Sequence, residues 1–117
     1  MTPDQFRKLA LSRPEVVEGS HMGHVDFRAN GRIIASLGAP DEAWGMVKLT
    51  AEQQLMVCSS QPKVFEPCKG GWGRMGCTGV KLAAAKAPEV REALILAVQN
   101  SMEKKPRKAT TPKRKKA

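Results

Sequence analysis

Apolar and polar residues at the start of the chain follow a helical period. Phe6 and Ala10 recur at the four-residue spacing that places side chains on one face of a helix. Thr2 and Gln5 form a capping box, in which each side chain satisfies a free backbone N–H group at the helix start. The sequence therefore predicts a helix over residues 3–13, ended by the proline at position 14.

The period changes to two after residue 23, which indicates β-strands. Val25 and Phe27 alternate with polar residues, as in a strand with one buried face. The dipeptide Asn30-Gly31 is a strong hairpin signal, because both residue types tolerate the positive φ angles of a type I′ turn. A two-residue turn at this point places Phe27 opposite Ile34 in the predicted hairpin.

The rest of the chain predicts two more strands and two more helices. In the first of these strands, Val47 lies on one face, and Trp44 and Met46 lie on the other. A second capping box starts a helix whose apolar surface includes Leu55, Met56 and Cys58. The predicted elements are a strand at residues 44–49, a helix at 51–59, a strand at 80–82 and a helix from residue 88 to 102.

These elements follow the order α-β-β-β-α-β(-β)-α, where the bracketed strand is an optional short one at residues 72–75. The order predicts a two-layer α+β fold, with an antiparallel sheet of four to five strands and helices on one side. A chain of 117 residues with 41% hydrophobic content supplies one core. No apolar run approaches the ~18–20 residues of a membrane helix, and the N-terminus does not resemble a signal peptide. We therefore expect a cytoplasmic protein without a membrane partner.

The positive charge of the chain is concentrated at its C-terminal end. Residues 1–103 hold 12 of the 20 Lys and Arg residues and all 11 acidic residues, a net charge of +1, whereas residues 104–117 hold eight basic residues and no acid. This predicts a nearly neutral folded domain at residues 1–103. The segment 104–117 lacks large apolar residues, so we expect a disordered basic tail.

A basic tail of this kind binds phosphates by releasing counterions, with little preference for base sequence. The alternative is a tail that only improves solubility. The candidate phosphate-binding residues of the tail are Lys104, Lys105, Arg107, Lys108, Lys113, Arg114, Lys115 and Lys116.

Five glycines lie between residues 70 and 79, but they lack the GxxxxGK[ST] order of a phosphate-binding loop. We interpret the segment as a hairpin tip or wing that projects Trp72 and Arg74. Lys69, Arg74 and Lys81 are candidate phosphate contacts, and Trp72 is a candidate for stacking on a base. The alternative, favoured by the small number of aromatic residues, is that Trp72 closes an edge of the core.

Two other groups of residues are weaker candidates for a functional site. His21, His24 and Asp26 offer two imidazoles and a carboxylate, but only His24 and Asp26 share a strand face, and no third ligand lies near them in sequence. Cys68 and Cys77 can approach each other across the glycine-rich segment. Without CxxC spacing, however, we interpret the cysteines as reduced, packed thiols. We expect no metal, no cofactor and no catalytic residue.

Three blocks of sequence, occurring in order, resemble the MmcQ/YjbR family. They are SHMGHVDFR at residues 20–28, GMVKL at 45–49 and GWGRMGCT at 71–78, and the resemblance covers residues 6–100. It implies a fold like that of type III secretion chaperones, with a five-stranded antiparallel sheet, and a proposed double-wing role in DNA binding. The basic tail departs from the family pattern.

Together, the tail and the resemblance predict a non-enzymatic protein that binds nucleic acid, DNA in particular, weakly and with little sequence preference. The alternative is a protein-interaction or dimerisation module. Trp44 and Met46 would form its apolar contact surface, on the sheet face away from the helices.

Overall fold

The computed structural model describes residues 1–21, 23–38 and 41–104. The helices are α1 (Pro3–Leu11), α2 (Ala51–Ser60), α3 (Gly70–Arg74) and α4 (Ala87–Met102). The strands are β1 (Val17–His21), β2 (His24–Ala29), β3 (Arg32–Leu37), β4 (Trp44–Lys48), β5 (Phe65–Pro67) and β6 (Cys77–Lys81).

The strands form one antiparallel sheet in the order β1-β2-β3-β4-β6-β5. The predicted α+β class and antiparallel sheet are confirmed. The sheet has six strands instead of the predicted four to five, because it includes the edge strands β1 and β5. The optional strand at residues 72–75 is absent, because this segment belongs mostly to the short helix α3.

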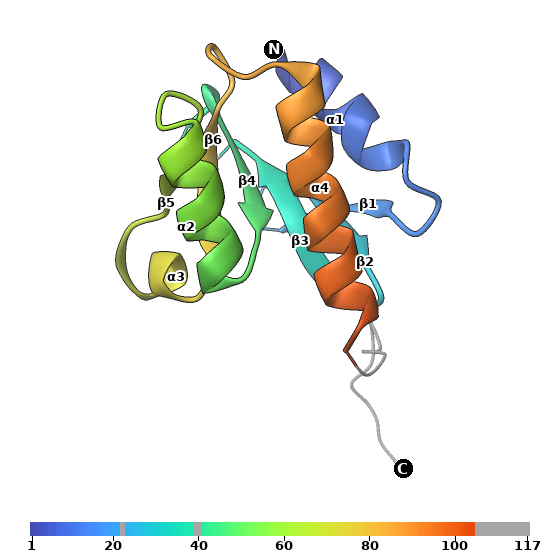
Figure 1. The fold of residues 1–117 in the computed structure, drawn as a ribbon. Helices are drawn as coiled ribbons and strands as arrows, with labels where there is room; N and C mark the ends of the chain where they lie inside the picture. Colours follow the sequence, from blue (N-terminus) through green and yellow to red (C-terminus); the bar gives the residue numbers. More distant parts are fainter. Residues whose placement is uncertain (22, 39–40, 105–117) are drawn as a thin grey trace.

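Helices α1, α2 and α4 lie on one face of the sheet (Figure 1). The three phenylalanines, Phe6, Phe27 and Phe65, are at most 2% exposed between the layers. The opposite sheet face has no helix over it in the part of the chain that the structure describes, as the sequence predicts. Among the described helices, none combines the length and apolar character needed to cross a bilayer.

Both predicted capping boxes are present. The hydroxyl of Thr2 accepts a hydrogen bond from the backbone N–H of Gln5, and Thr50 does the same for Gln53. Helix α1 ends at Leu11, two residues before the predicted end. None of the residues of α2 is fully buried.

The β2–β3 turn has the predicted positive φ angles at Asn30 and Gly31. The register further along the hairpin differs from the prediction. A β-bulge follows Phe27, so Phe27 lies opposite Ala35 instead of Ile34. Both Ile34 and Ala35 are buried as a result.

The same turn anchors the C-terminal end of α4. The side-chain amide of Asn30 donates hydrogen bonds of 2.8 Å to the carbonyl of Ser101 and 3.0 Å to that of Lys104. The hydroxyl of Ser101 donates in turn to the carbonyl of Ala29. These bonds fix the point from which the basic segment 104–117 continues.

Candidate nucleic-acid interface

The glycine-rich segment is a short helix, and the predicted hairpin tip or wing is wrong. Gln54 of α2 determines much of its position, since its side-chain amide donates to the carbonyls of Gly73, at 3.0 Å, and Cys77, at 2.8 Å. A side chain on Gly73 would collide with the carbonyl of Cys68, and Gly76 has a φ of +99°. The glycines therefore allow α3 to pack closely against the preceding and following backbone.

The segment presents an exposed tryptophan between two exposed cations. Trp72 is 68% exposed, and Lys69 and Arg74 are also exposed. The interpretation of Trp72 as a residue that closes the core is therefore wrong. The phenylalanines of the helix-covered face fill the interior instead.

Lys81 lies apart from these residues. It extends from the sheet face opposite the helices, where its ammonium is 3.4 Å from a carboxylate oxygen of Glu66 and 5.8 Å from the ring centre of Trp44. An exposed ion pair and a cation–π contact of this kind each contribute about 1 kcal/mol or less. Lys81 is thus partly neutralised.

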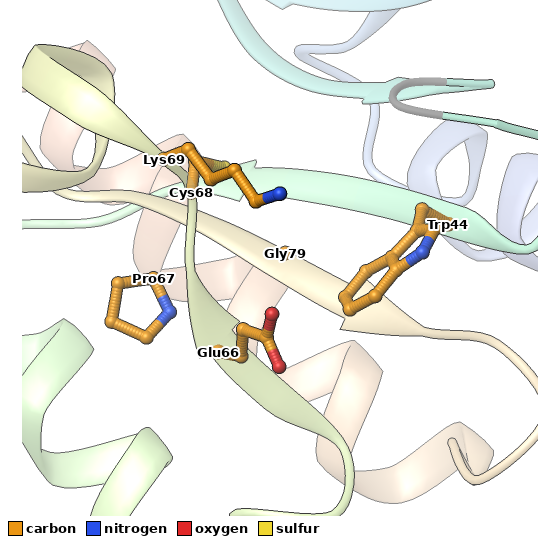
Figure 2. Close-up of a pocket in the computed structure, with 6 residues that line it drawn as sticks. All are labelled: Trp44, Glu66, Pro67, Cys68, Lys69 and Gly79. Atoms are coloured by element: carbon orange, nitrogen blue, oxygen red, sulfur yellow. The ribbon is translucent and has the colours of Figure 1, made fainter.

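A pocket of about 330 Å³ on this face is lined by Lys69 and by Trp44 and Glu66, the two residues that Lys81 contacts. In Figure 2, the side chain of Lys69 extends toward Trp44, and the carboxylate of Glu66 lies beside β5 on the side of Trp44. The pocket has apolar walls and carries both signs of charge. Of the four candidate residues in the folded part, Lys69, Trp72 and Arg74 lie together, and Lys81 lies beyond the pocket.

The end of α4 lies at the same end of the molecule as α3 (Figure 1). Helix α2 links the two. Gln54 holds α3, while the neighbouring Gln53 exchanges side-chain hydrogen bonds of 2.7 and 3.3 Å with Asn100 of α4. Lys104, the first residue of the basic segment, is exposed just beyond α4. The other predicted tail residues lie outside the described part of the chain: Lys105, Arg107, Lys108, Lys113, Arg114, Lys115 and Lys116.

The histidine and carboxylate constellation does not form a metal site. The carboxylate of Asp26 is 2% exposed and accepts hydrogen bonds from Nε and Nη2 of Arg28, at 2.8 and 3.0 Å. A buried carboxylate in a two-point pair with arginine is already neutralised. Within the described ranges, no group of three or more His, Cys, Asp or Glu residues is placed to hold a metal ion.

Two residues that shape this region have no clear signal in the sequence. Gln54 is one of two adjacent glutamines in a helix, and its bonds to α3 depend on tertiary packing. Glu66 pairs with Lys81 across two strands, and the edge strand that carries Glu66 has only three residues. A pair of this kind can be predicted only when the strand register is known.

Comparison with known proteins supports the fold alone. No protein-family profile matches the sequence, and no curated protein gives a significant match. The structure is similar to the crystal structure of Deinococcus radiodurans protein DR2400, which carries a DUF419 domain, with a TM-score of 0.70 and 16% identity. The match covers 88% of this chain and 80% of that chain. DUF419 is the MmcQ/YjbR-like family, so this chain has the fold of a member of that family.

Proposed function

We propose that the protein is a non-enzymatic member of the MmcQ/YjbR group that binds nucleic acid, DNA in particular, weakly and with little sequence preference. One observation carries the proposal. The exposed group Lys69, Trp72 and Arg74 lies at the end of the molecule from which the basic segment continues. Two cationic regions far apart in sequence are therefore available to one polyanion.

The two regions would contribute differently. The basic segment carries eight positive charges and no acid, so it would supply most of the affinity through counterion release. Arg74 and Lys69 would contact phosphates beside α3. An exposed tryptophan stacks on an unpaired base or enters a minor groove, and Trp72 has the exposure that either contact requires.

Charge reversal within the full-length chain tests the contribution of α3. Arg74→Glu should weaken binding to a fluorescent DNA duplex several-fold, because it removes a phosphate contact and adds repulsion. Arg91→Glu is the matched control, since Arg91 is an exposed cation in the N-terminal half of α4, away from the helix end at which the basic segment begins. Equal weakening by both variants would show that only net charge matters and would contradict a role for α3.

A protein-interaction module is the second candidate. The observation in its favour is the sheet face that the described helices leave open, on which Trp44 and Met46 are half-buried. Both side chains already have contacts, however, because Trp44 packs against Gly79 and Met46 lies against the thiol of Cys77. Light scattering tests this candidate: a dimer that Trp44→Glu converts to a monomer would support it, and a monomer unaffected by the change would count against it.

A further inference from the structure

Three sulfur atoms meet on the sheet face opposite the helices. Cys77 is on β6, and Met46, on β4, is its diagonal neighbour on the same face. Cys68 follows β5 and lies opposite Cys77, to whose carbonyl its backbone N–H donates at 3.0 Å. The three side chains thus come from three adjacent strands, although up to 31 residues separate them in sequence.

The sulfur atoms are close enough to share one metal ion. The thiol of Cys77 lies 3.7 Å from the thioether sulfur of Met46. Cys68 lies opposite Cys77, and side chains directly opposite each other in an antiparallel pair have Cβ atoms about 4.5–5.5 Å apart. Metal–thiolate distances are about 2.3 Å. Two sulfur atoms 3.7 Å apart can therefore both bind one ion placed between them.

Both thiols bind a metal ion as thiolates, and the metal displaces their protons when it binds.

The surroundings protect the cluster from bulk water. Cys77 is only 6% exposed, and Cys68 and Met46 are half-buried. Lys48 lies opposite Cys77 in the strand register, where its charge offsets that of two thiolates.

We propose that Cys68, Cys77 and Met46 form a trigonal binding site for Cu(I). Two thiolates and a thioether are soft ligands, which select Cu(I) over harder divalent cations. A structural zinc site needs four ligands, and the described residues offer no fourth His, Cys, Asp or Glu at this position. Binding forms three Cu–S bonds and releases the two thiol protons, with no change in oxidation state. The inference is independent of nucleic-acid binding.

A competition titration with a coloured Cu(I) chelator, under anaerobic reducing conditions, tests the site in the full-length chain. We expect one tightly held equivalent. Removing even an outer partner of a metal ligand costs about 10- to 100-fold in affinity. Removing a direct thiolate ligand, in Cys77→Ser or Cys68→Ser, should therefore weaken binding by ~100-fold or more. Met46→Leu, which preserves size, should weaken it by about 10-fold.

Cys58→Ser is the matched control, because Cys58 is a half-buried thiol on α2 outside the cluster. It should leave Cu(I) affinity unchanged. Circular dichroism establishes that each variant is folded, and X-ray absorption of the Cu(I) complex should show three sulfur neighbours at about 2.3 Å. Unchanged affinity in Met46→Leu, two sulfur neighbours instead of three, or equal loss in Cys58→Ser would each overturn the proposal.

Discussion

Single residues determine whether the glycine-rich segment can form a helix at all. The position of Gly73 leaves no room for a side chain, since the carbonyl of Cys68 occupies the space that a Cβ would need. Gly71, two residues earlier, faces open space apart from the tip of Arg74 at 3.7 Å. Two glycines in one helix thus have opposite roles: Gly73 is required for packing, and Gly71 is replaceable.

This difference gives a direct test of the helix. Gly73→Ala should reduce the free energy of unfolding by about 1–3 kcal/mol, because the clash is with backbone that cannot rotate away. Gly71→Ala should leave it unchanged or raise it by up to about 1 kcal/mol, because alanine favours a helix. Urea denaturation measures both. Equal effects of the two substitutions would contradict the packing of α3 against Cys68.

A second prediction at this scale concerns the thiol pair in the absence of metal. In a Cys58→Ser background, thiolate absorbance should appear with a midpoint near pH 7, the value to which the hydrogen bond from Cys68 lowers the pKa of Cys77. Because the pKa is lowered, the thiolate is present above this pH and is lost below it. Cys68→Ala should move the midpoint to about pH 8.5 or higher, the range of an ordinary or buried thiol. An unchanged midpoint would show that Cys68 does not act on Cys77.

At the scale of elements, the sequence predicts those helices and turns that have a local signal, such as a capping box or a regular apolar spacing. The capping boxes at Thr2 and Thr50, the Asn30-Gly31 turn and the apolar spacing of α4 are local signals, and each is found in the structure. In α4, Val90, Leu94 and Val98 are buried as predicted, although Met102 at the helix end is 48% exposed.

Other elements carry no local signal. Strand β1 reads VEGSH, and none of its side chains is fully buried, so it lacks the alternation by which a strand is recognised. Strand β5 has three residues, one of them proline. Helix α3 contains three glycines, the residue type with low helix propensity, and is held instead by Gln54. Tertiary contacts determine all three, and so the sequence alone predicts neither the exposure of Trp72 nor its position.

The buried face of α2 is also not predicted correctly from the sequence. Of the three residues predicted to form this surface, Cys58 packs against the core, as does Val57, whereas Leu55 and Met56 are 69% and 54% exposed. The hydrophobic residues of this helix are consecutive, so their pattern does not identify the buried face.

The anchoring of α4 by the β2–β3 turn is testable as a contact between elements. Asn30→Gly keeps the positive φ of the turn but removes both hydrogen bonds to the helix end. Each such bond contributes about 0.5–1.5 kcal/mol, so the variant should lose roughly 1–2 kcal/mol of stability in urea denaturation. If the free energy of unfolding of Asn30→Gly equals that of the unmodified protein, the turn does not anchor α4.

At the scale of the whole molecule, charge is divided between a balanced body and a cationic end. Within residues 1–103, several basic side chains form ion pairs with acidic ones: Arg7–Glu18, Lys8–Asp4, Arg28–Asp26 and Lys81–Glu66. The basic segment after α4 has no acid of its own. Electrostatic attraction to a polyanion is therefore expected from that segment, with Lys69 and Arg74 as the additional contacts of the folded part.

The salt dependence of DNA binding tests this division most directly. For the full-length chain on duplex DNA, the plot of log K against log salt should have a slope of up to about −9 if the eight basic residues of the tail, together with Lys69 and Arg74, neutralise phosphates. A chain ending at residue 103 should retain a slope of about −2, from Lys69 and Arg74 alone. Equal slopes for the two chains, or negligible binding by both, would contradict the account.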